Sequence, residues 1–261
     1  MADGMGTGPG GDGEGAGARD WSRRIEEALE RDLFVLYAQR IVDVASGETL
    51  RHELFVRMVV GQELIPAADF VPAAEELGLI QEIDRWVLGR AFEVAAHGDA
   101  VDLNVSLRSA DDELLELIRG RVRDTGADPG SLVLELDEEQ LVGEAEAGER
   151  FVRAARELGC RIALDAYVQG GRREGLLNGL PFDFVKLGPR FVDRLAADGR
   201  RRRKTRNAAG KSRRNGQRVI AQGVEDLVTL QLLEGLGIDE AQGYALGRPE
   251  PLESAFPTTS T

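Results

Sequence analysis

Short apolar segments alternate with amphipathic ones through most of the chain, and this alternation limits the folds that it can adopt. Short apolar runs are typical of buried strands, and apolar residues at spacings of three and four predict helices. From residue 101 onward, strands are predicted at 101–106, 131–139, 160–167, 183–188 and 217–226, helices at 110–126, 146–159, 173–180 and 227–237, and a closing segment at 241–249. Strands that alternate with helices in this way predict parallel βα units.

A predicted hairpin comes before this series. Two β-rich segments, 33–44 and 49–60, flank the turn 45–48, a helix is predicted at 21–31 before them, and helices at 67–80 and 82–96 follow. Six or seven βα units after a hairpin favour a closed βα barrel over an open sheet, and 261 residues suit one such domain. We expect the barrel at 19–255, between a flexible glycine-rich tail, 1–18, and a short C-terminal tail, 256–261.

The charge of the chain is unevenly spread. Residues 200–218 hold ten of the 33 Lys and Arg and no acid, which leaves 23 bases against 46 acids elsewhere. Between 198 and 217 the only apolar residues are Ala208 and Ala209, too few for the apolar stripe of a packed helix. We therefore expect 199–217 to be a solvated, mobile loop. The alternative is a surface for nucleic acid or an acidic partner, which would gain from counterion release, although the aromatics that stack on single strands are missing.

Several classes of protein are disfavoured by composition. No apolar run approaches about 18 residues, so we expect no membrane span, and the N-terminus lacks the pattern of a secretory signal. The single cysteine, Cys160, excludes an intramolecular disulfide and fits a reducing cytoplasm, where we expect this protein to work. His52 and His97 stand alone, so a zinc cluster is a poor hypothesis.

Polar side chains stand near the ends of successive predicted strands, where a βα barrel places its reactive groups. These residues are Glu53, Asn104, Glu135, Asp165, Lys186 and Gln242. One such acid alone more often caps a helix or anchors a loop. Several on successive strands converge on one point, and four of the six carry the oxygen ligands that hard divalent cations prefer. The sequence therefore predicts a cation site at one end of the barrel.

From 33 to 251 the chain resembles the EAL domain family, which hydrolyses the bacterial second messenger cyclic di-GMP. The likeness rests on these segments, in the order and approximate spacing of the family: "AQRIVDVASGETLRHELFVRMV", "IPAADFVPAAEELGLI", "LNVS", "LVLELDEE", "LDAYVQG", "FVKLG", "VIAQGVED" and "AQGYALGRP". The resemblance implies a modified TIM-type (β/α)8 barrel whose first strand is antiparallel to the rest, as the hairpin also suggests.

The resemblance also implies roles for single residues. Glu53 matches the glutamate that gives the family its name, and Asn104, Glu135 and Asp165 match the other ligands of its first metal, Mg²⁺ or Mn²⁺. Lys186 matches the lysine beside the scissile phosphate, and Glu138 matches a glutamate that steadies a loop. Gln39, Arg57 and Gln242 match residues that contact the ligand.

Three residues depart from the pattern of the family, at positions that serve its second metal and the activation of water. Ala166, Gly188 and Gln222 stand where the family has acids. Two cations about 3.5–4 Å apart need several carboxylates to offset their repulsion, and glutamine cannot act as a base. Losing one acid–base group typically lowers the rate about 10²–10⁴-fold. The chain thus resembles a degenerate member of the family, with at most one metal site.

Two functions follow from this resemblance. The first is a module in bacterial second-messenger signalling that does not hydrolyse, or barely hydrolyses, cyclic di-GMP and that binds cyclic di-GMP, a protein partner or a second copy of itself. The alternative is an active, metal-dependent cyclic di-GMP phosphodiesterase that yields linear pGpG. Nucleic-acid binding through 200–218 is a third, separate hypothesis.

Overall fold

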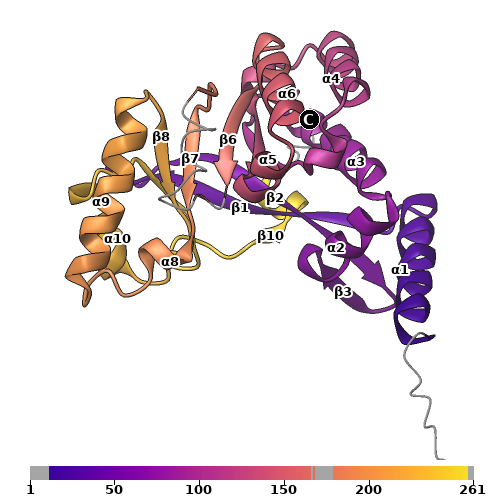
Figure 1. The fold of residues 1–261 in the computed structure, drawn as a ribbon, viewed down its shortest axis with the longest axis horizontal. Coiled ribbons are helices and arrows are strands. Elements are labelled where there is room, and N and C mark those ends of the chain that lie inside the picture. The colour runs from indigo at the N-terminus through magenta and orange to yellow at the C-terminus, as the bar shows by residue number, and fades with distance from the viewer. Residues whose placement is uncertain (1–11, 166, 168–178, 258–261) are drawn as a thin grey trace, which may run out of the picture.

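A closed barrel of eight strands lies at the centre of the part of the chain that this computed structural model describes, residues 12–165, 167 and 179–257 (Figure 1). Its strands are β1 (Phe34–Asp43), β2 (Thr49–Val60), β4 (Val101–Asn104), β5 (Leu132–Asp137), β6 (Arg161–Asp165), β7 (Phe184–Leu187), β8 (Arg218–Ala221) and β9 (Glu240–Ala241). From β2 to β9 all neighbours are parallel, whereas β1 is antiparallel to both β2 and β9 and closes the barrel. The modified barrel with an antiparallel first strand is confirmed.

The opening hairpin forms because its turn satisfies its own backbone. The carboxylate of Asp43 accepts hydrogen bonds from the backbone N–H groups of Ala45 and Ser46, at 3.0 and 2.9 Å. Gly47 takes the left-handed conformation, with φ 75°, that this tight turn requires. Two short strands extend the sheet outside the barrel: β3 (Glu63–Pro66) pairs with β2, and β10 (Glu250–Pro251) pairs with β1. The sequence patterns predicted neither.

Helices cover the outer wall of the barrel (Figure 1). They are α1 (Asp12–Glu30), α2 (Ala67–Leu77), α3 (Ile80–Ala95), α4 (Asp112–Thr125), α5 (Glu138–Gly143), α6 (Ala145–Glu157), α8 (Pro189–Val192), α9 (Gly199–Arg214), α10 (Leu227–Gly235) and α11 (Leu252–Ala255), with short 3₁₀ turns at Leu107–Ser109 and Pro129–Ser131. The predicted helices at 67–80, 82–96, 110–126, 146–159 and 227–237 are confirmed within a few residues. Most of the helix predicted at 173–180 lies outside the described residues.

Helix α1 corrects the expected boundary of the N-terminal tail. Its backbone is helical from Asp12, so residues 12–18, which we assigned to a flexible tail, continue the helix predicted at 21–31. Adding a residue to an existing helix costs far less free energy than nucleating one, so even glycine-rich sequence can extend it.

Helix α9 overturns the expectation of a loop at 199–217. Thr205, Ala208, Ala209 and Ser212 form a buried stripe at spacings of three and four, and the hydroxyl of Thr205 donates to the carbonyl of Phe191 at 2.8 Å. A count of apolar residues alone leaves out Thr205 and Ser212, the two small polar residues of this stripe. Small side chains suffice to seat a helix when their hydroxyl groups find acceptors, because the helix can then approach the wall closely.

Two separate sets of packed residues hold the barrel. A large apolar cluster lies between the strands and the helices, and a small one fills the barrel interior: Ile41, Val133, Ala163, Phe184 and Ile220. Near the N-terminal ends of the strands, the guanidinium of buried Arg51 pairs with Asp102 and Glu240, both at 2.6 Å. These layers close one end of the interior, so the polar strand ends can gather only at the other.

Candidate functional site

Three strands bring an ammonium group between two carboxylates, although Glu53 lies in the first half of β2, where the pairing of that strand with β4 ends. The Nζ of Lys186 on β7 lies 2.7 Å from Glu53 Oε2 on β2 and 2.5 Å from Glu135 Oε1 on β5. All three residues are buried, and Lys186 has no exposed surface. Asn104, the last residue of β4, donates from its Nδ2 to Glu53 Oε1 at 3.1 Å. The strand-end prediction therefore placed four of its six residues in direct contact.

Two glutamines extend this site across the seam where the barrel closes. Gln242, just after β9, donates from its Nε2 to Gln39 Oε1 on β1 at 3.0 Å. Gln39 donates in turn to the carbonyl of Gly247 at 2.7 Å. A Cβ on Gly243 would lie 2.2 Å from the backbone nitrogen of Val224, so only glycine lets the chain pass there and position Gln242.

The charges of the site are not balanced by Lys186 alone. Burial tends to raise the pKa of Glu53, but the charge of Lys186 and its hydrogen bonds outweigh this and lower that pKa. Burial and the neighbouring charge of Glu53 raise the pKa of Glu135 well above its usual value. Burial opposes the charge of Lys186, yet the surrounding acids, Asp165 among them, raise its pKa. One ammonium thus faces several carboxylates, an arrangement that favours an additional cation or a proton.

The donor atoms suit a hard divalent cation, but their present arrangement already holds an ammonium. Glu135 Oε2 is buried without a hydrogen-bond partner among the described residues and is a spare acceptor. Carboxylate and amide oxygens are the ligands that Mg²⁺ and Mn²⁺ prefer. Within the described ranges, however, no three His, Cys, Asp or Glu side chains converge as a metal site would need. The ammonium of Lys186 already contacts both Glu53 and Glu135.

Two of the three positions at which the resemblance implies an acid are neighbours in space. A Cβ built on Gly188 would lie 3.9 Å from Gln222 Oε1, so the two residues face each other at the ends of β7 and β8. Neither residue supplies a carboxylate. The third position, Ala166, lies outside the described residues.

Two other predicted residues are placed less directly. Glu138 is the first residue of α5 and is buried. In the sequence it follows directly after β5, the strand that carries Glu135. Arg57 lies further along β2, where its guanidinium stacks 3.7 Å above the centre of the Tyr37 ring. Its side chain lines neither of the two pockets described next.

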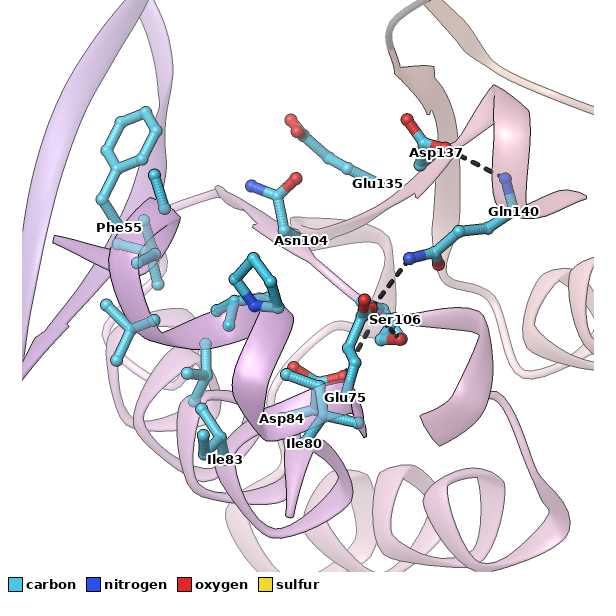
Figure 2. A pocket seen from close by; sticks show the side chains of 18 residues that line it. Phe55, Glu75, Ile80, Ile83, Asp84, Asn104, Ser106, Glu135, Asp137 and Gln140 are labelled. Carbon is cyan, nitrogen blue, oxygen red and sulfur yellow. Dashed lines mark hydrogen bonds between the residues drawn. The ribbon is translucent and has the colours of Figure 1, made fainter. Parts of the chain in front are cut away.

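A largely apolar pocket of about 380 Å³ opens beside the carboxylates and is called the apolar pocket below. Asn104 and Glu135 form its border with the site, and α2, α3 and β2 supply most of its wall (Figure 2). Figure 2 shows Glu75, Asp84, Ser106 and Gln140 close together in this pocket. Glu75 Oε1 accepts hydrogen bonds from Ser106 Oγ at 2.6 Å and from Gln140 Nε2 at 2.8 Å, and Asp84 Oδ2 accepts one from the Ser106 backbone at 3.0 Å.

Asp84 is a functional candidate that the strand-end argument missed. Burial raises its pKa to about 7. A signal was present in the sequence, because Asp84 occupies the apolar stripe of its helix together with Ile80, Ile83 and Val87. A carboxylate on the buried face of an amphipathic helix is costly unless it has hydrogen-bond partners or a ligand.

A second pocket of about 260 Å³ lies on the other side of Glu53 and is called the polar pocket below. Its lining comprises Gln39, Glu53, Phe55, Gln222, Gly223, Glu225, Gln242, Gly243 and Tyr244. Phe55 is half-buried and borders both pockets. The barrel mouth therefore offers two recesses that share Phe55, with Glu135 lining the apolar pocket and Glu53 lining the polar one.

Comparison with known proteins gives a consistent set of relatives. The EAL domain model matches residues 22–249. The chain is 31% identical over 241 residues to an uncharacterized signaling protein of Caulobacter vibrioides, and 31% identical over 247 residues to cyclic di-GMP phosphodiesterase PdeB of Shewanella oneidensis. These matches cover 90% and 91% of this chain but only 30% and 29% of the relatives, so the chain spans less than a third of their length.

Solved structures agree with this fold. The EAL domain of Xanthomonas citri FimX in complex with c-diGMP superposes with a TM-score of 0.85 at 23% identity, over 92% of this chain and 96% of that one. The PaMucR phosphodiesterase in its c-di-GMP complex superposes with a TM-score of 0.83 at 27% identity, over 90% of this chain and 99% of that one. Among the described helices, none is both long and apolar enough to cross a bilayer.

Proposed function

The chain belongs to the EAL domain family, and we propose that it binds cyclic di-GMP at the barrel mouth and hydrolyses it weakly or not at all. The observation that carries this proposal is the contrast between the two sides of the site. On one side, Glu53, Asn104 and Glu135 are gathered around Lys186. On the other, Gly188 and Gln222 face each other without a carboxylate.

The two pockets suit a ligand with two similar ends. Cyclic di-GMP carries two guanines on a ring with two phosphates, and the apolar pocket can cover the faces of one base. The carboxylates of Glu75 and Asp84 in that pocket are acceptors for the N–H donors of a guanine edge. Phe55, between the pockets, offers a face on which a base can stack. Two relatives of known structure hold this ligand, as their names state, which supports the same choice here.

The residues at the site support binding better than turnover. Glu53, Asn104, Glu135 and Asp165 would hold one Mg²⁺ or Mn²⁺, which would polarise a phosphodiester oxygen. Hydrolysis also needs a group that takes a proton from water. The amide of Gln222 cannot do so, and Gly188 has no side chain. Lys186 already makes short contacts to two acids of the first site, so its ammonium would compete with a metal ion for them.

An active phosphodiesterase with one metal is the rival function. The buried, unpartnered Glu135 Oε2 favours it, because a spare carboxylate oxygen beside a second acid is a natural metal ligand. The rival predicts formation of linear pGpG that depends on Mn²⁺ and disappears in Glu53→Ala.

Calorimetric titration and a turnover assay on the same samples separate these functions. We expect binding of cyclic di-GMP at micromolar concentrations, without pGpG above background in Mg²⁺ or Mn²⁺. Phe55→Ala should weaken binding about tenfold through the loss of stacking and packing, whereas Phe55→Leu should retain more of it. Metal-dependent turnover lost in Glu53→Ala would establish the rival. Absence of binding at tens of micromolar would contradict both and leave a protein-interaction module.

A further inference from the structure

Helix α9 presents a continuous row of positive charge on the outer surface of the barrel. Between Gly199 and Val224 the sequence has ten Lys and Arg and no acid. Nine of these cations lie on α9, which Figure 1 shows at the edge of the molecule. The buried stripe of Thr205, Ala208, Ala209 and Ser212 fixes which way the helix faces.

Four arginines lie opposite that stripe. With a rotation of about 100° per residue, Arg200, Arg203, Arg206 and Arg214 fall within an arc of about 120° centred nearly 180° from the buried residues. All four are exposed. They extend over 14 helical positions, which corresponds to about 21 Å along the helix axis.

These arginines lack the acidic partners that Arg201 and Arg213 have. Arg201 pairs with Asp193 at 3.2 Å, and Arg213 pairs with Asp239 at 3.2 Å, so the flanks of the helix are tied to the protein. For the side chains of the four outward arginines, the described part of the chain supplies no carboxylate within 4 Å. The four outward arginines therefore form no ion pair that stabilises the described fold.

The chemistry of the row points to a partner rich in phosphate. Eight of the ten cations of this acid-free stretch are arginine, whose planar fork matches phosphate oxygens in pairs. The outward face has no aromatic or large apolar residue that could anchor in a protein pocket or insert into a lipid interface. A bilayer is flat and would also meet neighbouring surface of a chain whose net charge is −13, whereas a duplex is narrow enough to contact the row alone.

We propose that the outer face of α9 binds the phosphate backbone of double-stranded nucleic acid, without base specificity. Because the whole chain carries a net charge of −13, the contact is short-ranged and depends on the local row within a Debye length of about 8 Å. Four phosphate contacts predict a slope of log K against log salt near −3.6. The dissociation constant should then rise about 150-fold between 50 and 200 mM salt.

Fluorescence anisotropy with a labelled 20-base-pair duplex tests this proposal on the full chain. The α9 variant carries Arg→Gln at Arg200, Arg203, Arg206 and Arg214. The control variant carries Arg→Gln at Arg90, Arg119, Arg123 and Arg153 on α3, α4 and α6, of which Arg90 is half-buried and the other three are exposed. Both variants lose four positive charges, and glutamine preserves helix propensity. We expect the wild type and the control to bind at 50 mM salt with the steep salt dependence, and the α9 variant to bind at least tenfold more weakly.

Three results would overturn the proposal. The first is no binding by the wild type at 50 mM salt up to about 100 μM, the weak limit for non-specific binding. The second is an equal loss in the two variants, which would assign the effect to net charge. The third is binding to phosphatidylserine vesicles without binding to the duplex. If circular dichroism shows that the fourfold α9 variant is unfolded, the double variant Arg203→Gln/Arg206→Gln decides in its place, with an expected intermediate loss.

Discussion

Replacing Lys186 by methionine removes the only positive charge that contacts Glu53 and Glu135 in the described site, and we expect it to destabilise the fold strongly. Methionine has a similar length and fills the same space, so the change isolates the ammonium. Lys186 has no exposed surface and the side chains of Glu53 and Glu135 are 5% and 0% exposed, so water cannot replace the lost charge. The two carboxylates would then lie unpaired in a site of low polarity.

The magnitude follows from these contacts. At an effective dielectric constant of about 20, one unit charge attracts another at 2.7 Å by about 6 kcal/mol, and most of this is offset by the desolvation of the ions. Removing one partner of a buried pair typically costs about 3–5 kcal/mol. For a domain of this size that corresponds to a fall in melting temperature of about 6–20 °C. Protonation of Glu135 can relieve part of the penalty, so the loss should be smaller at pH 5.5 than at pH 8.

Urea unfolding followed by circular dichroism, at both pH values, measures the loss. The matched controls are Glu135→Gln and the double variant Lys186→Met/Glu135→Gln, and the cycle of four proteins should give a coupling energy of about 2–3 kcal/mol. Adding Mn²⁺ should raise the melting temperature of Lys186→Met more than that of the wild type, because a dication can take the place of the ammonium. A loss below about 1 kcal/mol, or one unchanged by Glu135→Gln, would refute the electrostatic reasoning.

Three further changes test other parts of the structure. The pKa of Asp84 is raised to about 7 by burial, so its contribution to stability is fully present below about pH 4 and is lost as the pH rises through 7. Asp84→Asn should therefore stabilise the protein at pH 8, by at most about 4 kcal/mol, and have little effect at pH 4; equal effects in thermal melts at both pH values would argue against this. Gly243→Ala would place a Cβ 2.2 Å from the Val224 backbone, and we expect a loss of at least about 2 kcal/mol in urea unfolding together with weaker cyclic di-GMP binding. Ala209→Leu should overpack the buried stripe of α9 and cost about 1–3 kcal/mol, whereas an unchanged unfolding midpoint would mean that α9 is not seated as described.

The fold and the centre of the site were accessible from sequence because both depend on strand ends. Parallel strands bring their C-terminal ends to one face, so Glu53, Asn104, Glu135 and Lys186 could be predicted to lie together without any coordinates. What could not be predicted is which of them touch. The reach of Lys186 Nζ to two carboxylates depends on the stagger of the barrel strands, which periodicity does not encode.

Helix α9 and Asp84 could not be predicted correctly from residue type alone, because position decides which of their side chains are buried. Thr205 and Ser212 were counted as polar, although their place between Ala208 and Ala209 makes them part of a buried stripe. Asp84 was passed over because it lies within a helix and not at a strand end, although a carboxylate in an apolar stripe is itself a signal. In both cases a neighbour in space, a carbonyl or a backbone N–H, satisfies a group that the sequence alone shows as misplaced.

The antiparallel first strand also determines the order in which this molecule can assemble. The seam between β1 and β9 contains only two register pairs, Val42 with Ala241 and Asp43 with Glu240, and these join opposite ends of the sequence. Contacts of such high contact order form late in folding, after the intervening chain has been ordered. Gln39 and Gln242 hydrogen-bond across this seam. A small molecule that touches both would tie the ends of the chain together, and its binding energy would oppose the opening of the whole barrel and not of a single loop.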